Sequence, residues 1–339
     1  MPRTLSVSFF GYGYWGKNLL RTLMNEPQAR VKWACDISPE RLKQIRADYP
    51  QLAVTHDYAT AMRDSEVEAV VLATPAETHV PLAIQALEYG KHVFVEKPMG
   101  TDVQEADRLA AVVRNSGKTF QVGHIFEYAE PVQVLRDWIR TGRLGNVRYV
   151  TGNRSSLGPR IRTDCNIVWD YAIHDLYILM YLFQQEPERV AARGQCTFYK
   201  NIEDTVFLDL HFPGGTWAVL HSSWAAPLKR RDITFVGDRA MAVYDETRED
   251  KLVLYDCGYS PAEGYDSWGN WNWRLFDRGK EVAKTGQSQP LATEIANFLE
   301  CASRGASPVS NVEDGLRTIR VLNAVNRSLK TNGSEVSLK

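Results

Sequence analysis

A strand, a glycine-rich turn and a helix follow one another at the start of this chain, and no other feature constrains its fold as strongly. Leu5–Phe10 is an apolar run typical of a buried strand, and Lys17–Met24 has the apolar spacing of a helix. The turn between them fits the spacing GxGxxG and consists of Gly11, Tyr12, Gly13, Tyr14, Trp15 and Gly16. In this context the glycines allow a tight turn, close approach to a pyrophosphate, and close packing of the helix. We therefore predict a dinucleotide-binding turn whose helix N-terminus faces the phosphates.

An acidic residue follows this turn at the spacing expected for a ribose contact. Asp36 comes directly after the second expected strand, Val31–Cys35, and stands 20 residues beyond Gly16. A carboxylate at this point accepts hydrogen bonds from the ribose 2′-OH and repels a 2′-phosphate, so we predict NAD rather than NADP as the cofactor. Arg41 lies close by in sequence and would offset part of that repulsion. For the bulky Tyr14 and Trp15, packing beneath the helix and contact with the nicotinamide ring both remain open.

The remaining sequence divides into two regions of different pattern. Up to about His124, short apolar runs alternate with amphipathic stretches, which is typical of a parallel sheet with crossover helices. Beyond it, strand-like segments dominate, and turns such as Pro213-Gly214-Gly215 indicate antiparallel hairpins. We predict an α/β chain with an N-terminal NAD-binding Rossmann domain over residues 1–124. An α+β domain built on a mostly antiparallel sheet would span residues 125–339.

Composition excludes several classes of partner. Forty basic residues face 41 acidic ones, which offers no electrostatic reason for nucleic acid or an anionic membrane. No apolar run reaches about 18 residues, and a first strand at Leu5 leaves no room for a signal peptide. The five cysteines are scattered without a CxxC spacing, so neither disulfides nor a zinc site is expected. We expect a cytoplasmic protein without a metal, nucleic-acid or membrane partner.

Three polar residues indicate a reacting site. Lys97 follows the expected strand His92–Val95, at the sheet edge where open parallel sheets bind ligands. Asp170 and His174 stand at i and i+4 in a helical pattern over Val168–Phe183, which brings both to one face. Each of these residues by itself could have a purely structural role, but the three together indicate a site that oxidises an alcohol.

The sequence resembles the glucose–fructose oxidoreductase, inositol dehydrogenase and rhizopine catabolism (Gfo/Idh/MocA) family over essentially its whole length. The resemblance rests on the following motifs in this order: the glycine turn, Ala73-Thr74-Pro75 with His79, Glu96-Lys97-Pro98, Gly123-His124 leading to Pro131, Asp170 with His174, and Pro290–Phe298. It implies a Rossmann domain joined to an open-faced antiparallel sheet, and a nicotinamide cofactor acting on sugars, inositols or related polyols. It also implies pairing through the sheet face, hence a homodimer or homotetramer.

The resemblance further assigns residues to roles. The catalytic positions of the family fall on Lys97, Asp170 and His174. The cofactor site would include, besides the glycine turn, Asp36 and Arg41, the residues Thr74, Pro75, His79, Glu96 and Lys97. His174, whose ordinary pKa is near 6.5, would be the general base and Lys97 would stabilise charge on the same oxygen. Lys97 as the base is the rival assignment. Asp170 would hold a neighbouring hydroxyl or orient the other two residues.

One departure from the family bears on the substrate. Many members carry GGxxxDxGxH around the acid and histidine, whereas this chain has Asn166-Ile167-Val168-Trp169 before Asp170 and Tyr171-Ala172-Ile173 after it. This variant looks most like the members that oxidise C3 of UDP-N-acetylglucosamine. Arg160 and Arg162 would then bind the diphosphate through their planar guanidinium groups, unless they are solvated loop residues. Further substrate residues would be Asn166, Arg154 as a weaker candidate, and Tyr128, which lines the sugar pocket or packs in the core.

Three alternative functions remain open at this point: a dehydrogenase of inositol or a free sugar, a ketosugar reductase, and a catalytically silent NAD-binding regulator. Alternation along the second-domain strands predicts one buried face containing Val206, Leu208, Leu210 and Phe212. The opposite face would be the oligomer interface, with Phe207, Asp209, His211, Trp217 and Trp224 as possible members.

Overall fold

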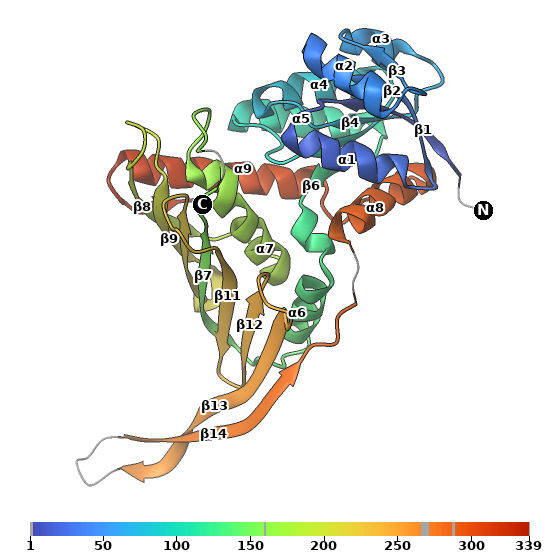
Figure 1. Cartoon of the computed structure of the whole chain (residues 1–339). Coiled ribbons are helices and arrows are strands. Elements are labelled where there is room, and N and C mark those ends of the chain that lie inside the picture. Colours follow the sequence, from blue (N-terminus) through green and yellow to red (C-terminus); the bar gives the residue numbers. More distant parts are fainter. Residues whose placement is uncertain (1–2, 159–160, 266–270, 287–288, 339) are drawn as a thin grey trace. The chain divides into compact units, whose positions relative to one another are not determined.

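The computed structural model describes residues 3–158, 161–265, 271–286 and 289–338 (Figure 1). The chain forms two compact units. The first consists of Met1–Tyr128 with Ser288–Arg320, and the second of Ala129–Gln287 with Val321–Lys339.

The first unit is built on a six-stranded parallel sheet with the strand order β3-β2-β1-β4-β5-β6. Its strands are β1 (Leu5–Phe10), β2 (Ala29–Cys35), β3 (Ala53–Thr55), β4 (Ala69–Leu72), β5 (His92–Glu96) and β6 (Phe120–Gly123). The helices that connect them are α1 (Tyr14–Met24), α2 (Pro39–Asp48), α3 (Tyr58–Arg63), α4 (Ala76–Glu88) and α5 (Val103–Ser116). The strand order reverses between β1 and β4, and in such sheets ligands bind at this switch point. The predicted Rossmann architecture is confirmed. The sequence reading lacked only α3, whose Tyr58 ring stacks on Phe10.

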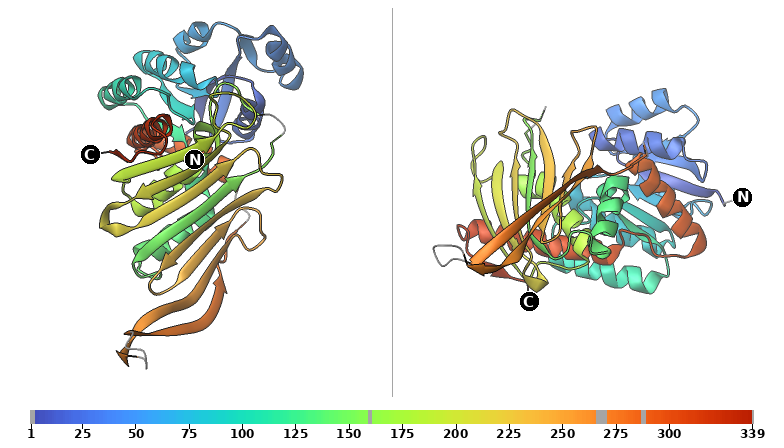
Figure 2. Two further views of the ribbon diagram at one scale, coloured as in Figure 1. Left: turned by 90° about the vertical axis from the view of Figure 1, so that its left-hand side faces the viewer. Right: turned by 90° about the horizontal axis from the view of Figure 1, so that it is seen from below.

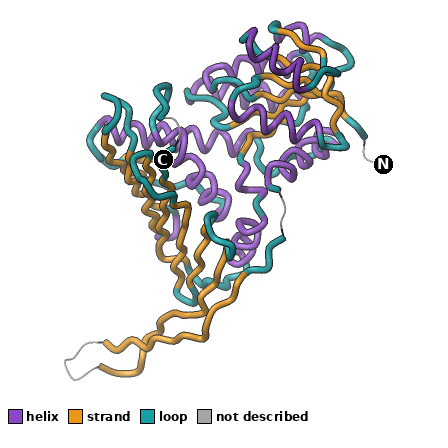
Figure 3. Tube along the Cα trace, in the orientation of Figure 1, coloured by secondary structure: helices purple, strands orange, loops and turns teal. Residues whose placement is uncertain are grey.

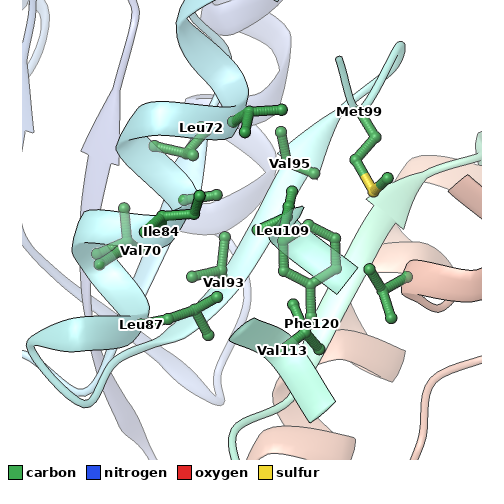
Figure 4. Close-up of a cluster of buried hydrophobic side chains, with 14 of the residues drawn as sticks. Val70, Leu72, Ile84, Leu87, Val93, Val95, Met99, Leu109, Val113 and Phe120 are labelled. Atoms are coloured by element: carbon green, nitrogen blue, oxygen red, sulfur yellow. The ribbon is translucent and has the colours of Figure 1, made fainter. Parts of the chain in front are cut away.

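Both faces of this sheet are buried, and successive residues of the central strands β1, β4 and β5 alternate between two hydrophobic clusters. Phe10, Leu72 and Val95 lie in one cluster, which receives side chains from α4 and α5. Figure 4 shows this cluster, with Ile84 of α4 and Leu109 of α5 against the strand residues. The neighbouring positions on the same strands belong to the second cluster, which receives side chains from α1 and α2.

A segment far along the chain completes this unit. It contains α8 (Pro290–Arg304) and the first part of α9 (Val312–Lys330). Ile295 of α8 is fully buried in the second cluster, and Phe298 meets Phe94 edge-on at 5.8 Å between ring centroids. The sequence reading had placed residues 125–339 together in the second domain. Local periodicity identifies a helix but not the sheet against which it packs, so it did not reveal this return of the chain.

The second unit is built on a nine-stranded sheet with the order β14-β13-β12-β11-β7-β10-β9-β8-β15. Its strands are β7 (Val147–Ser155), β8 (Arg189–Gln195), β9 (Thr205–His211), β10 (Trp217–Ser223), β11 (Arg230–Gly237), β12 (Met241–Asp245), β13 (Leu252–Tyr265), β14 (Trp271–Val282) and β15 (Val336–Ser337). Figure 2 shows them side by side. Every pair is antiparallel except β7 with β10, so the prediction of a mostly antiparallel sheet is confirmed. The expected turn at Pro213–Gly215 connects β9 to β10. The long β13–β14 ribbon was not predicted beyond Tyr255.

One face of this sheet is covered by helices and the other is open. The helices α6 (Glu130–Arg140) and α7 (Ile173–Phe183), labelled in Figure 1, lie on one side of the strands, and Figure 3 shows helices and strands in separate colours from the same side. On β9 and just beyond it, the four residues predicted to be buried are buried, whereas Phe207 on the opposite face is 56% exposed. Trp217 at the start of β10 is also exposed. The prediction that Trp224 belongs to the open face is wrong. Trp224 follows the end of β10 and is only 1% exposed.

The part of the chain that the structure describes has neither a membrane-spanning helix nor a metal-binding cluster. None of its helices is both long and apolar enough to cross a membrane. Among the same residues, no group of three or more His, Cys, Asp or Glu side chains is arranged to hold a metal ion.

We predict that Ile295→Ala lowers the free energy of unfolding by about 2–5 kcal/mol, because it leaves a cavity in the second cluster. The matched control is Ile37→Ala, since Ile37 belongs to the same unit but is 71% exposed. Urea denaturation followed by fluorescence measures both changes. If the two variants unfolded at the same urea concentration, α8 would not be an integral part of the first unit.

Candidate cofactor and reaction site

The glycine turn has the geometry that a bound pyrophosphate requires. Gly11 has a φ of 100°, in the region that favours glycine, and a Cβ there would collide with the backbone carbonyl of Ala73. A Cβ at Gly16 would collide with the carbonyl of Gly11. At Gly13, by contrast, a Cβ would meet nothing within 4 Å, so the backbone is open to a ligand at the N-cap of α1. The residues therefore fit the pyrophosphate of a dinucleotide.

Asp36 is bonded to the glycine turn itself. Its Oδ2 accepts a hydrogen bond from the backbone N–H of Tyr12 at 2.7 Å, and its Oδ1 accepts one from the N–H of Ser38 at 2.9 Å. Arg41 lies beside it, with Nη1 3.4 Å from Oδ2, which is the proximity that the sequence predicted. The carboxylate is almost fully buried. Asp36 thus orders the loop at the end of β2 in addition to any contact with a ribose.

His79 joins the two loops that follow β4 and β5. Its ring nitrogens each lie 2.8 Å from a carbonyl oxygen, Nε2 from that of Thr74 and Nδ1 from that of Pro98. Burial lowers the pKa of this imidazole, and the two carbonyl oxygens oppose the shift. Because His79 is enclosed, the structure gives it a role in holding the Thr74-Pro75 loop rather than an open face for a cofactor.

A buried carboxylate connects the glycine turn to Lys97. Glu96 Oε1 accepts a hydrogen bond from the indole Nε1 of Trp15 at 2.5 Å, and Oε2 accepts one from the backbone N–H of Lys97 at 3.2 Å. Burial raises the pKa of Glu96 to about 7, against the effects of the Trp15 hydrogen bond and of Lys97. Neither bulky residue of the turn packs beneath the helix: Trp15 is partly exposed and Tyr14 is 88% exposed.

In the second unit, the predicted helix over 168–183 begins with a different turn. Residues Val168–Ala172 form a π-helical turn, and α7 follows from Ile173. Such turns are rare in proteins, and those that occur are frequently found at functional sites. Asp170 lies in this turn and His174 at the start of α7, and Nδ1 of His174 lies 3.0 Å from the hydroxyl of Tyr177.

Both oxygens of the Asp170 carboxylate are held by side chains of the same unit. Oδ1 accepts a hydrogen bond from Nη1 of Arg162 at 3.2 Å, and Oδ2 accepts one from Nε1 of Trp224 at 3.0 Å. Arg162 also forms an ion pair with Asp164. The sequence analysis missed Trp224 as a partner of Asp170, because nothing in the strand pattern connects two residues 54 positions apart.

The other expected substrate residues have structural partners. Asn166 donates from Nδ2 to Glu203 and Asn326, and its Oδ1 accepts from the backbone of Val168. The Tyr128 hydroxyl bonds Asn297 and Ser310 within the first unit. Arg154 is buried and forms ion pairs with Asp175 and Glu246. Arg160 lies outside the described residues. For Tyr128, packing in the core is therefore the alternative that the structure favours.

The predicted residues form two groups. At the carboxyl ends of the strands in the first unit, the structure connects the glycine turn with Asp36 and, through Glu96, with Lys97. In the second unit it collects Arg162, Asp170 and His174 on and beside the π-helical turn.

Comparisons with known proteins agree with this fold. The chain is 25% identical to an inositol 2-dehydrogenase of Rhizobium meliloti, over 96% of this chain and 97% of that relative. Among solved structures, UDP-N-acetylglucosamine 3-dehydrogenase GnnA from Acidithiobacillus ferrooxidans superposes with a TM-score of 0.81 at 22% identity, covering 97% and 98% of the two chains. GenD2 from gentamicin A biosynthesis, in complex with NAD, gives a TM-score of 0.83 at 19% identity over 100% and 97%. At these identities the two structures show a shared fold.

Family models cover most of the chain. Residues 5–124 match the model described as "Oxidoreductase family, NAD-binding Rossmann fold". Residues 132–243 match the "GFO/IDH/MocA C-terminal domain". With the GxGxxG turn open at Gly13 and Asp36 behind it, the chain belongs to the Gfo/Idh/MocA family and is an NAD-binding oxidoreductase.

Proposed function

We propose that this protein oxidises a secondary ring hydroxyl of a sugar, at C3 of a UDP-N-acetyl sugar, and passes the hydride to NAD. The observation that carries this proposal is the Glu96 carboxylate, which joins Trp15 of the glycine turn to the backbone of Lys97. This link supports a position for Lys97 beside the cofactor. Asp170 and His174 would act on the same substrate as Lys97.

Each residue has a definite task in this reaction. Bound NAD supplies the acceptor for the hydride. His174 takes the hydroxyl proton on its imidazole ring, which is oriented by the contact of Nδ1 with the Tyr177 hydroxyl 3.0 Å away. The Lys97 ammonium donates a hydrogen bond to the hydroxyl oxygen and stabilises charge that develops on it. The Asp170 carboxylate, held by Arg162 and Trp224, accepts a hydrogen bond from a neighbouring hydroxyl.

A second candidate is the oxidation of inositol or a free sugar. Arg162, one of the two arginines expected at a diphosphate, is engaged with two carboxylates, Asp164 and Asp170. One of the relatives that match almost the whole chain at 25% identity is named an inositol 2-dehydrogenase. Both observations favour a substrate without a nucleotide.

We also propose that the exposed face of the second-unit sheet pairs two or four copies of the chain. Phe207 and His221 stack on this face at 4.6 Å, and His211 and Trp217 at 6.3 Å between ring centroids. These partly exposed rings supply an apolar surface of the kind that protein interfaces use. Light scattering that gives the mass of a monomer would exclude this assembly.

A substrate screen separates the two candidates. We expect NADH to form fastest with UDP-N-acetylglucosamine, and N-acetylglucosamine without the nucleotide to have a kcat/KM lower by a factor of roughly 100, because the diphosphate contacts are lost. Absorbance at the NADH band measures both rates, with inositols and free sugars in the same panel. An inositol with the highest kcat/KM would instead establish the second candidate.

We expect His174→Asn to lower kcat by about 10²- to 10⁴-fold, because the general base is removed. His56→Asn is the control, since His56 is exposed in the first unit. The pH–rate profile of Lys97→Ala identifies which residue titrates: with His174 as the base, the profile keeps the acidic limb of the wild type at a lower rate. A wild-type kcat in His174→Asn would refute its assignment as the base.

We expect Asp36→Asn to raise kcat/KM for NADP relative to NAD by roughly tenfold, because the substitution removes the charge that repels a 2′-phosphate. The amide oxygen still accepts from the N–H of Tyr12, whereas the bond from the N–H of Ser38 to the other carboxylate oxygen is lost. Asp48→Asn is the control, because Asp48 accepts from the hydroxyl of the same Tyr12 and not from the backbone of the turn. Initial rates with the two cofactors give the ratio, and an unchanged ratio would contradict the role of Asp36.

A further inference from the structure

Trp224 occupies an unusual position for a tryptophan beside a sheet. It follows the last residue of β10, and its ring is almost completely buried. Its backbone N–H donates to the carbonyl of Asp204 at 2.8 Å, and its ring meets that of Tyr171 edge-on at 6.5 Å. Its indole N–H donates to Oδ2 of Asp170 at 3.0 Å. A buried side chain thus directs its one polar atom at the carboxylate to which we assign a role with the substrate.

The backbone around Trp224 is itself held firmly. Asp204, which accepts from Trp224, is buried and also accepts from the N–H of Phe198 at 2.9 Å. The hydroxyls of Thr205 and Ser223 bond one another at 2.8 Å across the β9–β10 pair. The chain at the end of β10 therefore has little freedom to move against β9.

The same frame holds the start of the π-helical turn. The N–H of Ile167, one residue before that turn, donates to the carbonyl of Glu203 at 2.9 Å. Glu203 and Asp204 are consecutive, so one short stretch of chain binds both the entry of the turn and the backbone of Trp224. The backbone is therefore fixed at Ile167, before the turn that carries Asp170, and at Trp224. These two attachments together set the distance between the Asp170 carboxylate and the indole N–H.

Arg162 and Trp224, which both donate to Asp170, differ in rigidity. Arg162 is a long side chain that is 39% exposed and shares its guanidinium with Asp164. Trp224 has only two side-chain torsions, and burial fixes both. A hydrogen bond to a carboxylate is charge-assisted and therefore stronger than one between neutral groups, and a fixed donor also sets its direction. The side chain of Arg162 can change its conformation when a substrate binds, whereas the indole of Trp224 stays in one position.

We propose that Trp224 is a positioning residue of the reaction, whose buried indole N–H fixes the carboxylate of Asp170 in the orientation that receives the sugar hydroxyl. The inference rests on the proposed role of Asp170. A shift of about 1 Å in a reacting or orienting group costs on the order of 100-fold in rate, so a fixed donor has a measurable effect.

The first test removes the donor and keeps an aromatic ring. Trp224→Phe is expected to lower kcat/KM about 10- to 100-fold, with the Kd for NAD and the Tm close to the wild type. Trp224→His, which keeps a ring N–H, recovers part of the loss. Trp33→Phe is the matched control: it loses an indole bond of 2.8 Å to Asp64 in the first unit and keeps its activity. Wild-type kcat/KM in Trp224→Phe would overturn the proposal.

A double-mutant cycle shows whether Trp224 acts through Asp170. If it does, Trp224→Phe costs less than about twofold once Asp170→Asn is present, because the effects of coupled residues do not add. Additive losses would mean that the ring only fills space, and would overturn the proposal. Should Asp170→Asn itself keep full activity, the role of Asp170 falls and the positioning role falls with it. A different outcome is a loss of activity in Asp170→Asn with full activity in Trp224→Phe. That result would remove only the positioning role of Trp224.

A third measurement needs no substrate. The chain has nine tryptophans, and ¹⁵N labelling of their indoles gives one N–H signal each. The signal missing in Trp224→Phe identifies Trp224. We expect this signal to shift in Asp170→Asn, since the acceptor loses its charge, while the Trp33 signal stays in place. An unshifted Trp224 signal would show that the contact is absent in solution and would overturn the inference whatever the enzyme oxidises.

Discussion

The approach of backbone to backbone at the glycine turn is the constraint from which the cofactor site follows. The N–H of Gly11 bonds the carbonyl of Cys35 at 2.8 Å, and the N–H of Ala73 bonds that of Phe10 at 2.8 Å. No side chain fits between these strands at this point, since a Cβ on Gly11 would overlap the carbonyl of Ala73. This closeness lets α1 begin at once, with its free N–H groups at the switch point of the sheet.

The first unit also buries acidic side chains. Burying a carboxyl group costs stability, so a fold selected for stability alone would avoid them. Glu294 of α8 is fully buried, and burial together with the nearby Glu96 and Glu127 raises its pKa well above the usual value. Burial thus favours the neutral form of this carboxyl group. The pKa of Glu96 is raised to about 7, so this group can change its charge near neutrality. Buried carboxyls of this kind are typical of functional sites, where a cost in stability is tolerated.

Sequence reasoning recovered those parts of the molecule whose cause is local. The glycine turn, Asp36 with Arg41, and the alternation on β9 each depend on residues within one element or its neighbour, so spacing reveals them. Contacts between distant segments decide the placement of residues 288–320, Tyr128 and Trp224, and the periodicity of the sequence does not reveal such contacts. The alternation that suggested an exposed Trp224 ends at Ser223, where the chain leaves the strand. The π-helical turn also escaped notice, because the apolar pattern of 168–183 suits either kind of helix.

The second unit supports its reacting residues from the side of the sheet as well as from the end of β10. Arg154 of β7 is buried and donates to Asp175 at 2.8 Å and to Glu246 at 2.6 Å. A buried guanidinium is tolerable only when carboxylates compensate its charge, so these contacts are obligatory partners. Asp175 is the residue next to His174, which means that this ion pair anchors the first turn of α7 to the strand beneath it. His174 is held through its neighbour by Arg154, and Asp170 is held directly by Trp224. The two functional side chains are therefore supported from two places, Arg154 on β7 and Trp224 directly after β10.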